Sequence, residues 1–443
     1  MSVSQLRFNS SSPVAPDHFG FSDRTRRTVD QPIGFLIAMA LTNPGLISLA
    51  AGLVDYETLP SPECRELVQQ LLTDDSTGRS RLQFGTTLGL PGLRQQLLQH
   101  LATLDGQNLE QFGATADQII ITTGSQQLLA LLTDVLVNPG DIVLTGWPSY
   151  FVYTGVLLTA GALVRGIDTD DEGIIPARLQ ATLQAIQDSG QLSRVKIVYA
   201  QSYHDNPTGL TLAVERRPQV VEIVKRFSRY AGHRILLMED AAYRELTFAG
   251  DPPPSIRSFD TDHQHVALLQ TFSKPFAPGV KVGYGLLPRE LVEPVRLQKD
   301  NLDFGTANLN QHLLLRAMQS GLYDRHVAML RARYRDKAAY MLAALDEHLG
   351  DFPAGEAHWT HPRGGLYVWL TLPAGIDTGR SGALFERCVR EGVLYVPGAY
   401  CYGSDSTRHI PTNTLRLSFG TATLEHIREG IRRLSVAIRG CLT

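Results

Sequence analysis

Short runs of apolar, often β-branched residues recur through the middle of this 443-residue chain. They are QIIIT (118–122), DIVLT (141–145), VKIVYA (195–200), RILLME (234–239) and VALLQTF (266–272). Apolar runs without polar alternation are typical of strands that are buried on both faces of a parallel sheet. Segments with helical spacing, such as 125–136 and 214–231, separate these runs. The alternation predicts an α/β fold in which helices flank a mostly parallel sheet.

The composition excludes several classes of protein. Hydrophobic residues make up 43% of the chain and charged residues 19%, with a formal net charge of −3, so a disordered chain, a coiled coil and a nucleic-acid-binding protein are not expected. No apolar run is long enough to span a membrane, and the polar N-terminus lacks the apolar region of a secretory signal. The cysteines lie far apart without a Cys-x-x-Cys pair, so we expect no metal site and free thiols in a cytoplasmic protein.

We expect three parts along the chain. Residues 1–55 form an N-terminal tail and arm that packs with the small domain, and the Ser-, Arg- and Asp-rich residues 1–30 are typical of a mobile tail or a docking arm. Residues 56–320 form the large domain that contains the sheet. A long helical pattern at 326–350 is followed by short strand and helix patterns, so residues 321–443 are expected to form a smaller α+β domain.

Polar residues follow several of the predicted strands, where ligands of open α/β sheets bind. After 118–122, Gly124 turns the chain and Ser125 occupies the expected N-cap of a helix, which is either a phosphate site or a plain capped helix. After 195–200, Asn206 begins an Asn-Pro-Thr-Gly turn and could donate an N–H to a ligand. An ordinary turn is the alternative.

Two further strand ends carry ionisable side chains. Asp240 ends a strongly apolar strand, where a carboxylate must be paired, hydrogen-bonded or neutral, and Tyr243 follows it. A helix cap is the alternative role for Asp240. Lys274 follows the strand at 266–272. A lysine held out of water can attack a carbonyl as the free amine, whereas a surface lysine only extends its charge into solvent. Lys281 lies in the Pro-Gly loop that comes next.

Together these side chains match the needs of pyridoxal 5′-phosphate (PLP). Its phosphate requires an anion site, its aldehyde a lysine amine, its ring nitrogen a carboxylate, and its phenolate oxygen hydrogen-bond donors. A protonated ring is the electron sink that stabilises a carbanion at the Cα atom of a substrate. The sequence therefore predicts a PLP site at the carboxyl ends of the strands.

Ordered sequence segments between residues 47 and 420 carry a family resemblance. They are ISLAAGLVDYETLPSPE, LQFGTTLGLPGLRQQL, ITTGSQQLLALLTDVLVNPGDIVLTGWPSYF, DNPTG, EDAAY, TFSKPFAPGVKVGY, PRGGLYVW, VLYVPG and TLRLSF. The chain resembles the class I/II aminotransferase family of fold-type I PLP enzymes, most closely the branch of 2-aminoadipate and kynurenine aminotransferases. The resemblance implies a homodimer whose active sites lie at the subunit interface, with the N-terminal arm folded over them.

The resemblance also implies roles for individual residues. Lys274 would form the Schiff base with the cofactor and act as base and then acid toward the substrate. Asp240 would pair with the pyridine nitrogen of the ring. Asn206 and Tyr243 would hold the phenolate oxygen, and Tyr150 would stack on the ring face.

Substrate and phosphate contacts are implied in the same way. Arg416 would bind the α-carboxylate of the substrate with the bidentate fork of its guanidinium, and Gly52 and Asn206 would lie alongside it. The phosphate would be held by Gly124, Ser125, Gln126, Ser273 and Lys281.

The chain departs from the family pattern at several positions. Lys281 stands where relatives have an arginine, so the charge is kept but the fork is lost. Phe84 replaces a tyrosine whose hydroxyl reaches a phosphate across the dimer, and it cannot make that contact. Gly34 lies where relatives with acidic or kynurenine-like substrates often carry an arginine, which argues against a dicarboxylic substrate. The Tyr203-His204 pair replaces a Phe-Gln pair, so His204 is either a substrate contact or a surface residue of a turn.

The predicted reaction is a ping-pong transfer of an amino group between an amino acid and a 2-oxo acid. A PLP-dependent lyase, decarboxylase or cyclase would use the same cofactor residues and is the alternative. A regulator with a helix-turn-helix domain is not expected, because about thirty polar residues before the fold are too few for one. A nicotinamide dehydrogenase is not expected either, because no G-x-G-x-x-G follows the first strand.

Overall fold

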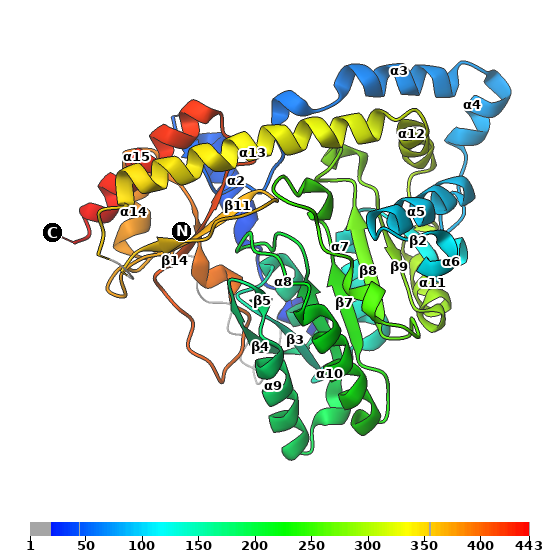
Figure 1. Cartoon of the computed structure of the whole chain (residues 1–443), viewed down its shortest axis with the longest axis horizontal. Helices are drawn as coiled ribbons and strands as arrows, with labels where there is room; N and C mark the ends of the chain where they lie inside the picture. Colours follow the sequence, from blue (N-terminus) through cyan, green and yellow to red (C-terminus); the bar gives the residue numbers. More distant parts are fainter. Residues whose placement is uncertain (1–18, 44, 354–355, 443) are drawn as a thin grey trace.

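The computed structural model describes residues 19–43, 45–353 and 356–442. Its largest sheet has eight strands in the order β2-β9-β8-β7-β6-β3-β4-β5 (Figure 1). Their bounds are β2 (Ile119–Thr122), β3 (Ile142–Trp147), β4 (Leu163–Asp170), β5 (Gly173–Ile174), β6 (Val195–Gln201), β7 (Leu236–Asp240), β8 (Val266–Thr271) and β9 (Gly283–Leu286). The part of the chain before residue 19, to which the prediction of a tail applied, lies outside the described residues.

The sheet is mostly parallel, as predicted. Strands β8, β7, β6, β3 and β4 run in parallel register, whereas β9 is antiparallel to both of its neighbours and β5 folds back on β4. The apolar runs of the sequence correspond to β2, β3, β6, β7 and β8. Strands β4 and β9 were not predicted, because Arg, Asp and Thr interrupt β4 and two glycines interrupt β9.

Helices cover both faces of this sheet, which explains why its strands are apolar throughout. In β3, Val143 packs on the side of α7 (Ser125–Leu136) and α8 (Phe151–Ala160). Its neighbours Ile142 and Leu144 pack on the opposite side, against α9 (Pro176–Asp188) and α10 (Arg216–Ala231). Successive side chains of a strand point to opposite faces, so both sets are buried. The remaining helices of this region are α3 (Ser61–Leu72), α4 (Asp75–Leu82), α5 (Pro91–Leu104), α6 (Leu109–Phe112), α11 (Arg289–Asp303) and α12 (Asn308–Gln319).

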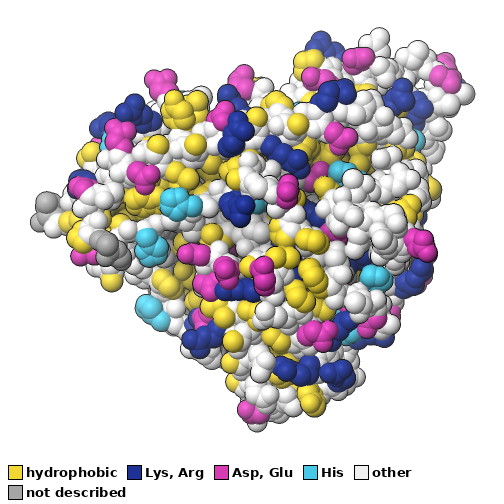
Figure 2. All heavy atoms as spheres, viewed as in Figure 1, with side chains coloured by type: hydrophobic (Ala, Val, Ile, Leu, Met, Phe, Trp, Pro, Cys, Tyr) yellow, Lys and Arg dark blue, Asp and Glu magenta, His cyan; other side chains and the backbone are white. Residues whose placement is uncertain are grey.

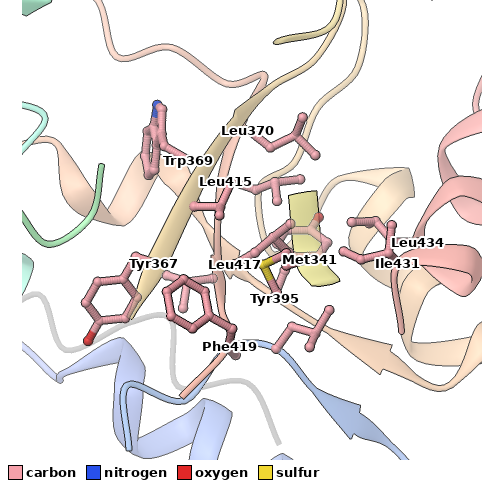
Figure 3. Packing of buried hydrophobic residues seen from close by; sticks show 14 of the residues in the cluster. Met341, Tyr367, Trp369, Leu370, Tyr395, Leu415, Leu417, Phe419, Ile431 and Leu434 are labelled. Atoms are coloured by element: carbon pink, nitrogen blue, oxygen red, sulfur yellow. The ribbon is translucent and has the colours of Figure 1, made fainter. Parts of the chain in front are cut away.

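A smaller α+β region follows the large sheet along the chain. Its sheet has the order β10-β11-β14-β13, and its helices pack their apolar faces onto that sheet (Figure 3). The elements are α13 (Leu322–Leu349), β10 (His358–Trp359), β11 (Tyr367–Thr371), α14 (Ala383–Glu391), β12 (Val393–Leu394), β13 (Val396–Pro397), β14 (Thr414–Ser418) and α15 (Leu424–Arg439). Helix α13 begins beside α12 of the large region and ends beside α15 of the small one (Figure 1). The predicted helix at 326–350 thus begins four residues earlier than expected.

The N-terminal elements divide between the two regions. Helix α1 (Asp23–Arg27) lies against α8, where Arg27 Nε donates to the carbonyl of Thr159. Helix α2 (Pro32–Thr42) packs side chains such as Leu36 into the small-region core, and β1 (Ile47–Ser48) pairs in parallel with β12. Only the part of the arm after α1 therefore packs with the small region among the described residues.

The described helices include none that is both long and apolar enough to cross a membrane. Basic and acidic side chains are interspersed over the face of the molecule shown in Figure 2, without a large area of one sign. This surface agrees with the small net charge of the sequence.

Candidate active site

A pocket of about 170 Å³ opens at the carboxyl ends of β6, β7 and β8. The side chains and loops around it come from segments that lie far apart in the sequence. The lining residues are Thr123, Gly124, Ser125, Gln126, Tyr150, Gln201, Asn206, Asp240, Ala242, Tyr243, Thr271, Ser273, Lys274 and Lys281. Every residue that the sequence analysis assigned to the cofactor is in this set.

The start of α7 forms one wall of the pocket. Gly124 is the N-cap with a positive φ of 74°, so Ser125 is the first helical residue and not the N-cap that the sequence predicted. A residue with a side chain is strained at that φ, which explains the glycine. Gly283 of β9 lets the turn approach closely, since a Cβ there would lie 2.4 Å from the backbone nitrogen of Ser125. The N-terminal end of a helix favours an anion, which suits a phosphate.

Asp240 lies buried at the end of β7 and faces the pocket. Its Oδ2 accepts a hydrogen bond from the Tyr199 hydroxyl at 2.8 Å, and its Oδ1 accepts one from the Ala242 N–H at 3.1 Å. Burial raises the pKa of the Asp240 carboxyl, and these two hydrogen bonds oppose the rise. Both partners are neutral, and no ion pair to Asp240 is formed within the described part of the chain. A buried carboxylate in this state can accept a proton or pair with a cationic ring nitrogen.

Asn206 is held by two side chains. Gln201, which is paired with Asp240 across β6 and β7, donates to the Asn206 carbonyl at 2.8 Å and accepts from the Asn206 N–H at 3.1 Å. Arg416 of β14 donates from Nη1 to Asn206 Oδ1 at 2.6 Å. Because its Oδ1 is occupied by the guanidinium, the Asn206 amide N–H₂ is the group available to a ligand oxygen in the pocket.

Lys274 extends from the turn after β8 into the pocket. Its side chain is partly buried, and its Nζ donates to the carbonyl of Gly52 at 2.8 Å. Thr271 Oγ1 accepts from the Ser273 N–H at 3.1 Å, which tightens the same turn. Lys281 also lines the pocket, from a left-handed backbone position with a φ of 55°. The pocket therefore contains two lysine side chains beside the positive end of a helix.

A strap formed by residues 49–55 contacts two cationic side chains of the site, Arg416 and Lys274. The carbonyl of Ala50 accepts from Arg416 Nη2 at 2.7 Å, and that of Gly52 accepts from Lys274. The far end of the strap is anchored at Asp55, which pairs with Lys337 of α13 at 2.7 Å. The strap thus brings Gly52 and Arg416, the residues predicted to bind substrate, next to the residues predicted to bind the cofactor.

His204 is not the surface residue of a turn that was one alternative from the sequence. Its ring is 2% exposed and is held between Thr247 Oγ1 at 2.8 Å and Thr211 Oγ1 at 3.0 Å. Burial lowers the pKa of His204 to about 3, so the ring is neutral. It is neither a surface residue nor part of the pocket lining. It packs against Gly364, where a Cβ would lie 2.1 Å from its Nε2.

Several residues in and around the pocket were not singled out from the sequence, among them Tyr199, Gln201 and Tyr367. Tyr199 and Gln201 lie in a predicted strand, and Tyr367 begins β11 and donates to or accepts from the Tyr243 hydroxyl at 2.9 Å. A phenol in a strand that is buried on both faces requires a hydrogen-bond partner, and this was the available signal for Tyr199. No sequence pattern indicated that Tyr367 is the hydrogen-bond partner of Tyr243, because the two residues meet only in the folded chain.

The residues present fit PLP. The start of α7 and Lys281 suit its phosphate. Asp240 offers a carboxylate without a cationic partner, which matches the ring nitrogen. Asn206 and Tyr243 offer donors, and Lys274 offers an amine in the same pocket.

Comparison with known proteins identifies the family. The model for aminotransferase class I and II matches residues 44–434. The chain is 32% identical to aromatic-amino-acid aminotransferase 1 of Thermococcus litoralis, with 89% of this chain and 88% of that protein covered. It is 30% identical to the 2-aminoadipate transaminase of Thermus thermophilus, with 90% and 91% covered.

Solved structures agree with this similarity. The kynurenine aminotransferase of Pyrococcus horikoshii, crystallised with pyridoxamine phosphate (PMP), superposes with a TM-score of 0.85 at 31% identity, over 96% of this chain and 98% of that one. The α-aminoadipate aminotransferase of Thermus thermophilus, solved with a phosphopyridoxyl-leucine adduct, gives a TM-score of 0.79 at 30% identity, over 95% and 98%. The chain belongs to the class I and II aminotransferases and is a PLP-dependent aminotransferase of fold type I.

Proposed function

We propose that the pocket residues carry out transamination in the roles that their positions favour. PLP, when bound, supplies the aldehyde that takes up the amino group and the cationic ring that withdraws electrons from it. Lys274 Nζ lies within the pocket and holds or moves the proton of the substrate's Cα. The observation that carries the proposal is that Lys274, Asp240, Asn206 and Tyr243 line one pocket beside the start of α7.

Three side chains set the charge and orientation of the bound ring. Asp240 keeps a proton on the ring nitrogen, and the Tyr199 hydroxyl keeps that carboxylate oriented. Asn206 and Tyr243, which line the same pocket, donate hydrogen bonds to the phenolate oxygen of the ring. Preorganised donors of this kind need no rearrangement during the reaction, which lowers the barrier.

Arg416 orients the substrate. It is 1% exposed, and two of its nitrogens are already held by Asn206 and the Ala50 carbonyl. Its remaining side-chain nitrogen, Nε, has no hydrogen-bond partner in the described part of the protein. A planar guanidinium fixed in this way presents its free edge to the carboxylate of an amino acid or 2-oxo acid.

Substitution of Lys274 tests these roles. We expect Lys274→Ala to abolish transamination and the visible absorbance of the loaded enzyme, because the amine is the only group at that position that can react with the aldehyde. Binding of PLP, followed by equilibrium dialysis, should persist through the phosphate site. Lys196→Ala, at a half-buried lysine near the start of β6 that does not line the pocket, is the matched control. Normal turnover by Lys274→Ala would refute the assignment.

A second measurement separates transamination from the other PLP reactions. We expect incubation of the loaded enzyme with an amino acid alone to convert PLP to PMP in stoichiometric amount and then stop. Catalytic release of ammonia or CO2 without an acceptor would instead indicate a lyase or a decarboxylase. The second half-reaction then requires a 2-oxo acid.

The amino donor is proposed to carry an uncharged side chain. Among the described residues that line the pocket, the cations are Lys274 and Lys281, and each has a role toward the cofactor. Gly34 of α2 offers no charge to a second carboxylate. Rates of PLP absorbance loss should be higher with aromatic amino acids than with 2-aminoadipate, which are the classes named for two relatives.

We also propose that the protein is a cytoplasmic homodimer. Each subunit would consist of an N-terminal tail and arm (1–55), a large domain (56–320) and a small domain (321–443). Phe84 and Phe304 are 86% and 72% exposed and border a hollow of about 780 Å³. Exposed aromatic side chains around a hollow are typical of a protein interface. All four cysteines are free, which agrees with a reducing compartment.

A further inference from the structure

Two tyrosine hydroxyls meet where the small region contacts the large one. Tyr243 follows β7 and lines the pocket, whereas Tyr367 begins β11 and does not line it. Their oxygens lie 2.9 Å apart, and their rings are 5.6 Å apart at 78°. Both side chains are at most 5% exposed. Figure 3 shows Tyr367 at the edge of the small-region core, with its hydroxyl pointing away from the other labelled residues.

The position of the Tyr367 hydroxyl is fixed from several sides. The strap residue Gly52 packs directly against it, since a Cβ at Gly52 would lie 2.4 Å from the Tyr367 oxygen. The Arg416 guanidinium lies over the ring, with Cζ 4.4 Å from the ring centre. The backbone of Tyr367 is paired with Ser418 of β14. The hydroxyl therefore keeps one position relative to Tyr243 without needing to be ordered by a ligand.

The proton count fixes the direction of the hydrogen bond once a ligand oxygen is present. Each phenol has one proton, so a Tyr243 that donates into the pocket must accept from Tyr367. A hydroxyl that accepts such a bond becomes a better donor, because hydrogen bonds in a chain polarise one another. Burial raises the pKa of Tyr243, so its proton is retained. The other ionisable groups near Tyr243 are Tyr150, Arg416 and Lys274, whose Nζ is 5.9 Å from the ring centre.

We propose that Tyr367 is a positioning residue, which orients and strengthens the hydrogen bond from Tyr243 to the phenolate oxygen of the cofactor. The inference rests on the proposed function, because it requires PLP in this pocket. It also means that β11 of the small region, which pairs with the strand of Arg416, orients the Tyr243 hydroxyl of the large region. Tyr367 would thereby favour the more negative state of the bound chromophore.

The test is a pH titration of the visible absorbance of the PLP-loaded protein. Removal of one oxygen in Tyr367→Phe should raise the pKa of the bound chromophore by up to about one pH unit, the size expected for a single hydrogen bond. Tyr243→Phe should raise that pKa further. In the double variant the Tyr367→Phe change should add nothing, because Tyr367 acts only through Tyr243.

Tyr395→Phe is the matched control. Tyr395 is also buried in the small region, and its hydroxyl donates to the Thr378 carbonyl at 2.9 Å, away from the pocket. It should lose comparable thermal stability without moving the chromophore pKa. The inference fails if Tyr367→Phe titrates like the wild type, or if its effect remains when Tyr243 is already phenylalanine. Failure of the wild-type protein to bind PLP at all would instead refute the proposed function.

Discussion

The hydroxyl of Tyr199 donates to Asp240 Oδ2 at 2.8 Å, from the middle of β6 to the end of β7. Without this donor the buried carboxylate would lose one of its two hydrogen bonds and would be more easily neutralised. We expect Tyr199→Phe to lower kcat by about tenfold, which corresponds to about 1.4 kcal/mol for a lost hydrogen bond. Steady-state kinetics of the loaded enzyme measures this change.

The neighbouring Tyr153 provides the control for that prediction. Its ring centre is 4.5 Å from that of Tyr199, and its hydroxyl shares a hydrogen bond with Thr133, not with Asp240. Tyr153→Phe should therefore reduce stability with little effect on kcat. Equal effects of the two substitutions on kcat would contradict the role given to Tyr199.

Arg416→Lys should weaken substrate binding. A lysine keeps the charge but cannot hold Asn206, the Ala50 carbonyl and a carboxylate at once. We expect kcat/KM for amino acid and 2-oxo acid to fall by about 30- to 150-fold, or about 2–3 kcal/mol. Arg408→Lys is the control, since Arg408 pairs with Asp168 outside the pocket lining. Unchanged kcat/KM for Arg416→Lys would show that the carboxylate binds elsewhere.

The pH dependence of stability should respond to Asp205. This carboxyl is largely buried beside Gln201 and Thr208, and burial raises its pKa to about 7. The folded chain therefore holds a proton that the unfolded chain releases above about pH 4, so this group reduces stability as the pH rises from 4 to 7. In Asp205→Asn the melting temperature should therefore fall less over this range. The free energy of unfolding should lose a pH-dependent change on the order of 1–2 kcal/mol.

Calorimetry or circular dichroism between pH 5 and pH 8 would measure that difference. Asp171→Asn, at an exposed turn, should follow the wild-type curve throughout. If Asp205→Asn is equally destabilised at every pH, the carboxyl is already ionised in the folded protein at pH 5.

Substitution of Phe84 should disrupt self-association. Phe84 is 86% exposed at the edge of a large hollow, and a charge placed there would be costly to bury. We expect sedimentation to show twice the 48.8 kDa chain mass for the wild type, and Phe84→Asp to weaken the dimer by at least about 30-fold. Tyr230→Asp, at a tyrosine that is 65% exposed on α10, should leave the dimer intact. A Phe84→Asp dimer of normal affinity would place the interface elsewhere.

Local patterns in the sequence predicted the large sheet and most of the pocket. The helix at Ser125–Leu136 lies where the sequence predicts it, although Gly124 and not Ser125 is its N-cap, and Asp240 and Lys274 lie at or just after the ends of apolar strands as expected. In these cases one strand and its following turn position the functional side chain. The position of a residue along the chain is then enough to place it at the edge of the sheet.

Contacts between distant segments could not be predicted in this way. His204 lies in a turn, and its burial depends on Gly364, which is 160 residues away in the sequence. The partnership of Tyr243 with Tyr367 likewise depends on the packing of the two regions. Strand β9 is rich in glycine because α7 packs against it, so its sequence has little β-character. Such residues follow from tertiary packing and not from local propensity.

The strap at residues 49–55 has a consequence for how this enzyme is studied by mutagenesis. It contacts Arg416 and Lys274 through the backbone carbonyl oxygens of Ala50 and Gly52. Every type of amino acid has such a carbonyl, so a side-chain substitution does not remove it. Residue 50 is already alanine, and exchange of its side chain would leave this carbonyl in place, although it touches Arg416, the group proposed to bind the substrate carboxylate. Replacement of the amide of residue 51 by an ester would make the Ala50 carbonyl a weaker acceptor. Its effect on activity would measure the contribution of the contact between Ala50 and Arg416, which no side-chain substitution at residue 50 can test.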